Sequence, residues 1–382
     1  MQQRLQQLDS LRGLAAVSVI LGHFVELIKE RHAGEGWLWV VTATPLSIVQ
    51  ASHEAVLLFF VLSGFVLALP FGRGPVNIRA FLARRLCRIY VPYWVAMVVA
   101  FVLATRLYRG PIPALGDWFN RQWDVPLTAR AVGDHFLLVG SFPNFKFSPV
   151  IWSLVHEMRM SLVFPWLMLV VARLSWPRAL ALALGVSLVG FTADRWCLQR
   201  ALGLDYFLTV HYAGAFVVGI LLARHREQVV APLHRLGRGG RWLVLAIAVC
   251  AYTYALWCAP SDHRLHPQIV DDWMAILGSA LFVALALASL RLGSFLTRQP
   301  FHFLGVTSYS IYLYHGLLVV GLAHAWYPRL SVGAIMGLTL VGTMALAALS
   351  YRWVEAPSIA LGRAWTRRLE AATDLSISRG RG

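Results

Sequence analysis

Apolar runs long enough to cross a lipid bilayer recur along almost the whole chain. A membrane-spanning helix needs about 20 mostly apolar residues, and roughly ten segments approach or meet that length. They are residues 10–28, 53–71, 89–105, 150–172, 178–193, 208–223, 242–257, 273–290, 303–324 and 332–353. The composition agrees, because 58% of the 382 residues are hydrophobic and only 14% are charged, unlike water-soluble domains. The sequence therefore predicts an all-α, polytopic integral membrane helical bundle with about ten transmembrane helices.

The basic residues are distributed unevenly between the connecting segments. If the N-terminus is cytoplasmic, about 22 of the 34 Lys and Arg residues fall on the inner side and about 11 on the outer side, with Arg159 inside a span. Cytoplasmic loops of membrane proteins collect Lys and Arg, so this distribution predicts that both termini are cytoplasmic. The same rule accounts for the formal net charge of +16 without invoking nucleic acid.

Two regions are polar enough to lie outside the hydrocarbon. The longest outer segment, residues 106–149, mixes aromatic and polar side chains and is expected to contain short interfacial helices. After Pro357 the chain becomes a basic tail, which is expected to lie on the inner leaflet or to be disordered. We therefore divide the chain into a transmembrane domain, residues 1–357, and a basic cytoplasmic tail, residues 358–382.

The first span contains one histidine, His23, in an otherwise apolar run. Asp9 or Ser10 is suited to cap the helix, and Arg12 falls in its first turn. An imidazole in hydrocarbon needs a polar partner or a water-filled cavity, so His23 is a candidate functional residue. The alternative is a histidine that only hydrogen-bonds to a neighbouring helix, and this stretch alone favours neither interpretation.

Two arginines three residues apart, Arg85 and Arg88, stand at the inner end of the third span. They share one helical face, and two guanidinium groups suit a phosphate or pyrophosphate. The alternative is that they are ordinary positive-inside anchors, and for these residues taken alone that alternative is the stronger one.

The fourth span carries a polar stripe that cannot face lipid cheaply. Ser153, Glu157 and Ser161 recur at every fourth residue, while His156 and Arg159 lie on an adjacent face. If the span enters from outside, Glu157 lies about 10 Å deep, at a depth similar to that of His23. We therefore hypothesise that Glu157 orients the imidazole of His23 and supports its protonated form, as a general base requires.

The ninth span has a second polar seam, formed by Ser308, Tyr312 and His315. Interhelical hydrogen bonding is the expected role of Ser308 and Tyr312, and the role of His315 stays open. His53 and Glu54 open the second span from outside and are interpreted as interfacial. The four cysteines show no CxxC motif and no metal-ligand spacing, so no metal site is predicted.

Taken together, these segments resemble the acyltransferase 3 family of bacterial membrane O-acyltransferases. The matching segments lie in order over nearly the whole chain: LDSLRGLAAVSVILGHF (8–24), FFVLSGFVL (59–67), RRLCRIYVPYW (84–94), IWSLVHE (151–157), TSYSIYLYH (307–315) and Glu355-Ala356-Pro357. A single motif would be weak, whereas six in order are specific.

The resemblance implies transfer of an acyl group, commonly acetyl from acetyl-CoA, to a hydroxyl of a saccharide or glycolipid at the bacterial inner membrane. It implies that His23 is catalytic, that Arg85 and Arg88 bind the CoA donor, and that Glu157 belongs to the active site. We add Ser153, Tyr312 and His315 as candidate substrate-binding residues. Acyl-CoA is then a co-substrate, and no further cofactor is expected.

A transporter or flippase of a lipid-linked or acylated saccharide is the alternative hypothesis. The same buried His, Glu and Arg side chains would then bind substrate or relay protons. Broken spans or an inverted repeat would favour a transporter, and the sequence shows neither clearly. The ordered motifs favour the enzyme.

Overall fold

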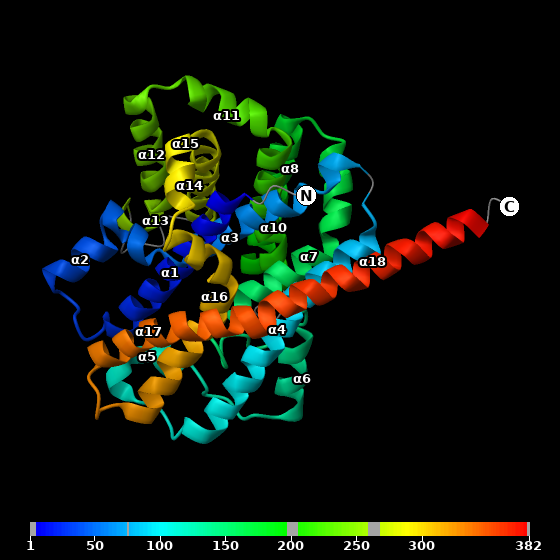
Figure 1. Cartoon of the computed structure of the whole chain (residues 1–382). Coiled ribbons are helices and arrows are strands. Elements are labelled where there is room, and N and C mark those ends of the chain that lie inside the picture. The colour runs from blue at the N-terminus through cyan, green and yellow to red at the C-terminus, as the bar shows by residue number, and fades with distance from the viewer. Residues whose placement is uncertain (1–4, 75, 197–204, 259–267, 380–382) are drawn as a thin grey trace.

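The computed structural model describes residues 5–74, 76–196, 205–258 and 268–379, and within these ranges the chain forms helices and no strands. Each predicted span coincides with a helix (Figure 1). These helices are α1 (Gln6–Ile28), α3 (Ser52–Ala68), α4 (Ile78–Leu107), α7 (Ile151–Ala172), α8 (Trp176–Trp196), α10 (Tyr206–Arg224), α12 (Arg238–Tyr252), α14 (Gln268–Ala288), α16 (Phe301–Trp326) and α17 (Val332–Ser350). The prediction of an all-α membrane bundle is confirmed.

Eight helical segments of the described chain are long and apolar enough to cross a membrane, rather than the ten predicted. The other two predicted spans are shorter helices, α3 with 17 residues and α12 with 15. Helix α3 ends just before Pro70, which lacks the N–H that would continue the helix. Helix α12 ends at Tyr252, and the chain resumes as the short α13 (Tyr254–Cys258).

Short helices connect the spans. On the predicted outer side they are α2 (Gly36–Thr42), η1 (Pro45–Gln50), η3 (Pro113–Leu115), α5 (Gly116–Asn120) and α6 (Ala129–Leu137). On the predicted inner side they are η2 (Phe71–Arg73), α11 (Arg226–Arg235) and α15 (Leu290–Leu296). The segment 106–149 thus contains short helices, as its mixture of aromatic and polar residues predicts.

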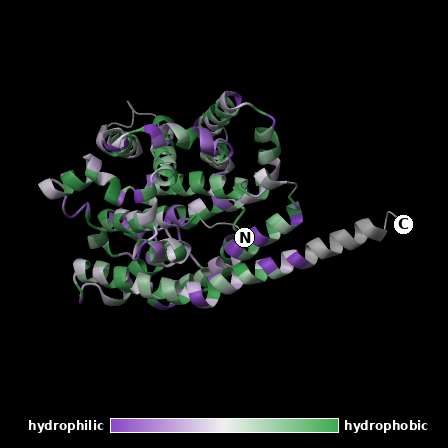
Figure 2. Ribbon diagram, turned by 45° about the horizontal axis from the view of Figure 1, so that its top comes forward, coloured by the Kyte–Doolittle hydropathy of each residue, from purple (hydrophilic) through white to green (hydrophobic). Residues whose placement is uncertain are grey.

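The surface of the bundle is apolar where lipid would surround it. Large apolar side chains point outward from several spans, among them Val341 at 70%, Leu243 at 62% and Val189 at 62% exposure. Hydrophobic residues dominate the long helices in Figure 2. So large an exposed apolar surface would be a liability in water and is the expected boundary with hydrocarbon.

Helices α1 and α16 pack closely in parallel, and two glycines make this approach possible. A Cβ atom at Gly13 would lie 2.6 Å from the backbone nitrogen of Gly305, and one at Gly305 would lie 2.7 Å from the carbonyl oxygen of Asp9. His23 and His315 each lie ten residues beyond these glycines. Equal steps along parallel helices bring the two imidazoles to the same level and the same interface.

The C-terminal part is a helix over the described residues. The π-helical turn η4 (Tyr351–Glu355) joins α17 to α18 (Ala356–Arg379). Early in α18, Gly362 lies against Cys87 and Arg84 of α4, and the helix extends from there away from the bundle (Figure 1). The predicted domain boundary at residue 357 falls inside α18, and residues 380–382 lie outside the described residues.

Candidate active site

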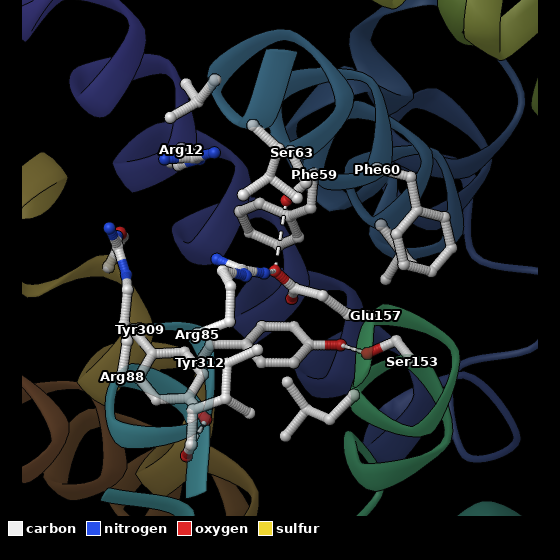
Figure 3. A pocket seen from close by; sticks show the side chains of 16 residues that line it. Arg12, Phe59, Phe60, Ser63, Arg85, Arg88, Ser153, Glu157, Tyr309 and Tyr312 are labelled. Carbon is white, nitrogen blue, oxygen red and sulfur yellow. Dashed lines mark hydrogen bonds and ion pairs between the residues drawn. The ribbon is translucent and has the colours of Figure 1, made fainter. Parts of the chain in front are cut away.

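A cavity of about 70 Å³ lies between α1, α3, α4, α7 and α16, toward the predicted inner side (Figure 3). Arg12, Arg85 and Arg88 line it from α1 and α4, with Glu157 from α7. Arg85 and Arg88 therefore do share one face, as their spacing predicts. We call this space the inner cavity.

Arg85 is held by the polar stripe of α7. Its Nη2 atom donates to Glu157 Oε1 at 2.9 Å and to Ser161 Oγ at 2.9 Å. Ser63 of α3 donates to the same Glu157 oxygen at 3.2 Å. Ser153, on the same face, forms a 2.6 Å hydrogen bond with the hydroxyl of Tyr312. The predicted stripe is real, and it faces α4 and α16.

Arg12 is the charged residue of the inner cavity to which the sequence analysis assigned no role. Its Nη1 lies 3.8 Å from Asp9 Oδ1, and its guanidinium lines the cavity beside Arg88. Eleven residues separate Arg12 from His23, which at about 100° per residue is within about 20° of three full turns. The shared helix face was thus a signal available in the sequence. Three guanidinium groups outnumber the carboxylates of Glu157 and Asp9, so the inner cavity favours an anion.

The hypothesised pairing of His23 with Glu157 is wrong. Glu157 hydrogen-bonds with Arg85 and Ser63, whereas His23 Nδ1 lies 3.0 Å from His315 Nε2. His23 stands on the other side of Tyr312, among the lining of a different cavity. The estimate from helical rise placed His23 and Glu157 at similar depth, but it could not show which helix faces meet.

The hydrogen-bond partners of His315 determine the proton positions. His315 Nδ1 lies 3.1 Å from the carbonyl oxygen of Ile311, which only accepts, so Nδ1 carries the hydrogen. In its neutral form Nε2 then accepts from His23 Nδ1–H. The neutral His23 is left with an unprotonated Nε2 that has no hydrogen-bond partner among the described residues. His315 therefore favours the neutral His23 tautomer that carries its hydrogen on Nδ1 and leaves Nε2 unprotonated.

A second cavity, of about 200 Å³, lies toward the predicted outer side of the bundle, and His23 is one of its lining residues. Trp118 of α5 tilts against the His23 ring with the centroids 4.9 Å apart. The remaining lining includes Glu26, His53, Phe145 and Trp152. We call this space the outer cavity.

The inner and outer cavities share two lining residues, Val56 and Tyr312. The Tyr312 ring lies between them, with its hydroxyl held by Ser153. Val56 and Tyr312 thus separate the cavity lined by three arginines from the cavity lined by His23.

His156 and Arg159 lie apart from both cavities. His156 Nδ1 and Arg159 Nη1 bond to Thr209 Oγ1 of α10, at 2.8 and 2.9 Å. Arg159 also pairs with Asp205 at 2.7 Å. These two residues of α7 connect helices, as their position on the adjacent face suggests.

The helical membrane bundle thus holds a cationic cavity toward its predicted inner side and a buried pair of imidazoles toward its predicted outer side. The chain matches the family described as "Acyltransferase domain" over residues 5–352. It belongs to this acyltransferase family and is an acyltransferase enzyme of the membrane.

Two known proteins are similar to the chain. Acyltransferase MdmB of Streptomyces mycarofaciens is 29% identical over 200 residues, covering 50% of this chain and 48% of MdmB, so the match spans about half of that relative. Nodulation protein 10 of Rhizobium leguminosarum bv. viciae is 25% identical over 395 aligned positions, covering 95% of this chain and 96% of that protein. No solved structure matches the chain.

Proposed function

We propose that this enzyme transfers an acyl group, acetyl from acetyl-CoA, to a hydroxyl of a saccharide or glycolipid on the outer side of the bacterial inner membrane. One observation carries the proposal: the inner cavity with three arginines and the outer cavity with His23 are adjacent and share Tyr312 in their linings. A cytoplasmic donor and an external acceptor could then react without either crossing the membrane.

The donor would enter from the cytoplasmic side. Its phosphates would bind Arg12, Arg85 and Arg88, because guanidinium groups pair strongly with phosphate oxygens. The pantetheine arm would pass Tyr312 and bring the thioester toward His23. In the empty site Glu157 neutralises Arg85 through the 2.9 Å ion pair, and the donor phosphates would compete with it for this guanidinium group.

The acceptor hydroxyl would approach from the outer cavity. His23 Nε2 removes its proton as the oxygen attacks the thioester carbonyl, giving a tetrahedral intermediate and an imidazolium. Collapse of the intermediate breaks the carbon–sulfur bond, and the imidazolium returns the proton to the thiolate. An acyl-histidine intermediate would use the same nitrogen. Both routes depend on the tautomer fixed by His315.

The test is thioester turnover by the purified protein in liposomes, with acetyl-CoA as donor and a panel of bacterial glycans as acceptors. We expect release of free CoA that requires both an acceptor and His23. The His23→Ala variant should lose transfer yet still bind acetyl-CoA, whereas Arg85→Ala should mainly weaken donor binding. His225→Ala, a change on the inner surface, is the control. Full activity of the His23 variant would overturn the mechanism, and failure of acetyl-CoA to bind would favour the transporter hypothesis.

A further inference from the structure

A chain of buried hydrogen bonds ends at the outer cavity but is not used by the mechanism above. His53 Nε2 lies 2.6 Å from Asp272 Oδ1, and His211 Nε2 lies 2.8 Å from Asp272 Oδ2. Asp272 is 1% exposed and His211 is 2% exposed, whereas the His53 side chain is 36% exposed. His53 is thus the accessible end of a buried network, not the merely interfacial residue that the sequence suggests.

The hydrogen-bond donors in this network indicate where its proton resides. Trp273 Nε1–H donates to Ser187 Oγ at 2.9 Å. His211 Nδ1 lies 2.9 Å from Ser187 Oγ, which can donate to it, and 3.2 Å from the Ser187 carbonyl oxygen, which only accepts. A neutral His211 accepts the shorter of these two hydrogen bonds and donates its Nε2–H to Asp272. The buried carboxylate needs a compensating positive charge, and of its two imidazole partners His53 is the one that solvent reaches and that can take up a proton there.

Helix packing brings His53 to the cavity that contains His23. Gly22 and Ser52, the residues that precede them, touch: a Cβ atom at Gly22 would lie 2.8 Å from Ser52 Cβ. Both imidazoles line the outer cavity. The His53 ring stacks on Trp152 with an interplanar angle of 10° and the centroids 6.0 Å apart.

His23 and His53 differ in their hydrogen-bond partners. His23 is backed by His315 and a carbonyl group, a chain that fixes a neutral base. His53 is backed by a carboxylate, which stabilises an imidazolium. An imidazolium donates from both nitrogens, and His53 Nδ1 makes no hydrogen bond among the described residues.

We propose that His53 is a cationic hydrogen-bond donor that binds the acceptor in the outer cavity, and that Asp272 is the positioning residue that keeps it protonated. The inference deepens the proposed function and rests on it. The partner chemistry is a polyhydroxylated ring: one oxygen accepts from His53, another group donates to Glu26, and the ring face packs on Trp118 or Trp152. One hydroxyl is then left beside His23.

The protonation of His53 can be tested without any acceptor. Diethyl pyrocarbonate modifies neutral imidazoles, and mass spectrometry of the full-length protein reports the rate at each histidine. Near neutral pH we expect His53 to react about tenfold faster in Asp272→Asn than in the wild type, because losing a carboxylate partner shifts the balance toward the neutral ring by about that factor or more. His32, which pairs with Glu35 at 2.8 Å on the surface, should react equally in both proteins. Equal His53 rates would overturn the proposal and place the proton on His211.

The acceptor role is tested in the turnover assay with the acceptor that supports the wild type. His53→Gln and Asp272→Asn should raise the KM for the acceptor about tenfold or more, as expected for loss of a charged hydrogen bond, while the Kd for acetyl-CoA stays unchanged. Asp205→Asn is the matched control, because it neutralises another carboxylate on the same side, paired with Arg159. If the wild type turns over and His53→Gln leaves the acceptor KM unaltered, this inference fails alone. If the wild type has no transferase activity, the proposed function fails, and the modification rates still decide the protonation of His53.

Discussion

Replacing His315 tests whether that residue orients His23, the proposed base. In the structure His23 Nδ1 donates to His315 Nε2 over 3.0 Å, and this is the hydrogen bond that leaves His23 Nε2 free to accept a proton. A neutral hydrogen bond contributes about 0.5–1.5 kcal/mol net, and a buried group left without its partner loses about 1–3 kcal/mol. His315 is 1% exposed and His23 is 9% exposed, so the higher range applies to truncation.

His315→Ala should therefore lower kcat by about 5- to 150-fold, since each 1.36 kcal/mol is a factor of ten. His23→Ala should lose more, about 10²- to 10⁴-fold, because it removes the base itself. His315→Gln should recover part of the loss, since the glutamine amide oxygen can accept from His23 Nδ1–H. The assay is acetyl transfer at saturating acetyl-CoA, with thermal unfolding as the check on folding.

The double variant His23→Ala/His315→Ala tests whether His315 acts through His23. If His315 acts through His23, removing both side chains should cost no more than removing His23 alone. Additive losses, or equal activity of His315→Gln and His315→Ala, would mean that His315 supports the fold or contacts the substrate rather than orienting the base.

Three further predictions concern the inner cavity and the helix contacts. Arg12→Ala and Arg88→Ala should each weaken acetyl-CoA binding by about 10- to 150-fold, the effect of losing a charge-assisted hydrogen bond, as measured by equilibrium binding at fixed salt; unchanged affinity would exclude a phosphate role. Glu157→Gln should bind acetyl-CoA at least as tightly as the wild type but unfold at a lower temperature, because the variant loses the ion pair with Arg85. A normal melting temperature with a loss of kcat alone would instead indicate a catalytic role for this carboxylate. Gly22→Ala should lower the free energy of unfolding by about 1–3 kcal/mol through overpacking, because the added Cβ would lie 2.6 Å from the Gln50 carbonyl oxygen. Gly337→Ala is the control and should not destabilise the protein, since no atom lies within 4 Å of the Cβ added there. Equal losses of stability in the two variants would contradict the packing argument.

Much of the fold follows from the sequence because hydrocarbon imposes a simple rule. Apolar runs of about 20 residues predict helices, and all ten predicted segments are helical in the structure. The stripe of Ser153, Glu157 and Ser161 was equally predictable, because i to i+4 spacing specifies one helix face. These are local properties, which depend only on spacing along one element.

Contacts between helices were harder to predict, and the active site depends on them. The sequence places His23 and Glu157 at comparable depths, and a carboxylate is the more familiar partner of a catalytic histidine. What decides the pairing is the close approach of α1 and α16 at Gly13 and Gly305. A glycine in a membrane helix is common, so nothing in its own sequence context marks the helix it will contact. The network behind His53 was missed for the same reason, since Asp272 lies 219 residues away in the chain.

The position of Glu157 makes physical sense when the two cavities are considered together. An anion site in the membrane holds several guanidinium groups close together, and their mutual repulsion costs free energy in the absence of ligand. Glu157 offsets that repulsion by pairing with Arg85, while Arg88 forms no ion pair among the described residues.

The inner cavity, at about 70 Å³, is small, so an entering phosphate would have to displace side chains and compete with Glu157 for Arg85. A carboxylate at this point thus stabilises the empty site, and donor binding would replace that internal counter-ion with the phosphates of the substrate. The proposed base needs the opposite surroundings: His23 hydrogen-bonds to a neutral imidazole that in turn bonds to a carbonyl group, so its Nε2 can gain a proton and lose it again within one reaction cycle. The separation of charge at one end of α1 from neutral proton transfer at the other is therefore a requirement of the chemistry that these two cavities are proposed to perform.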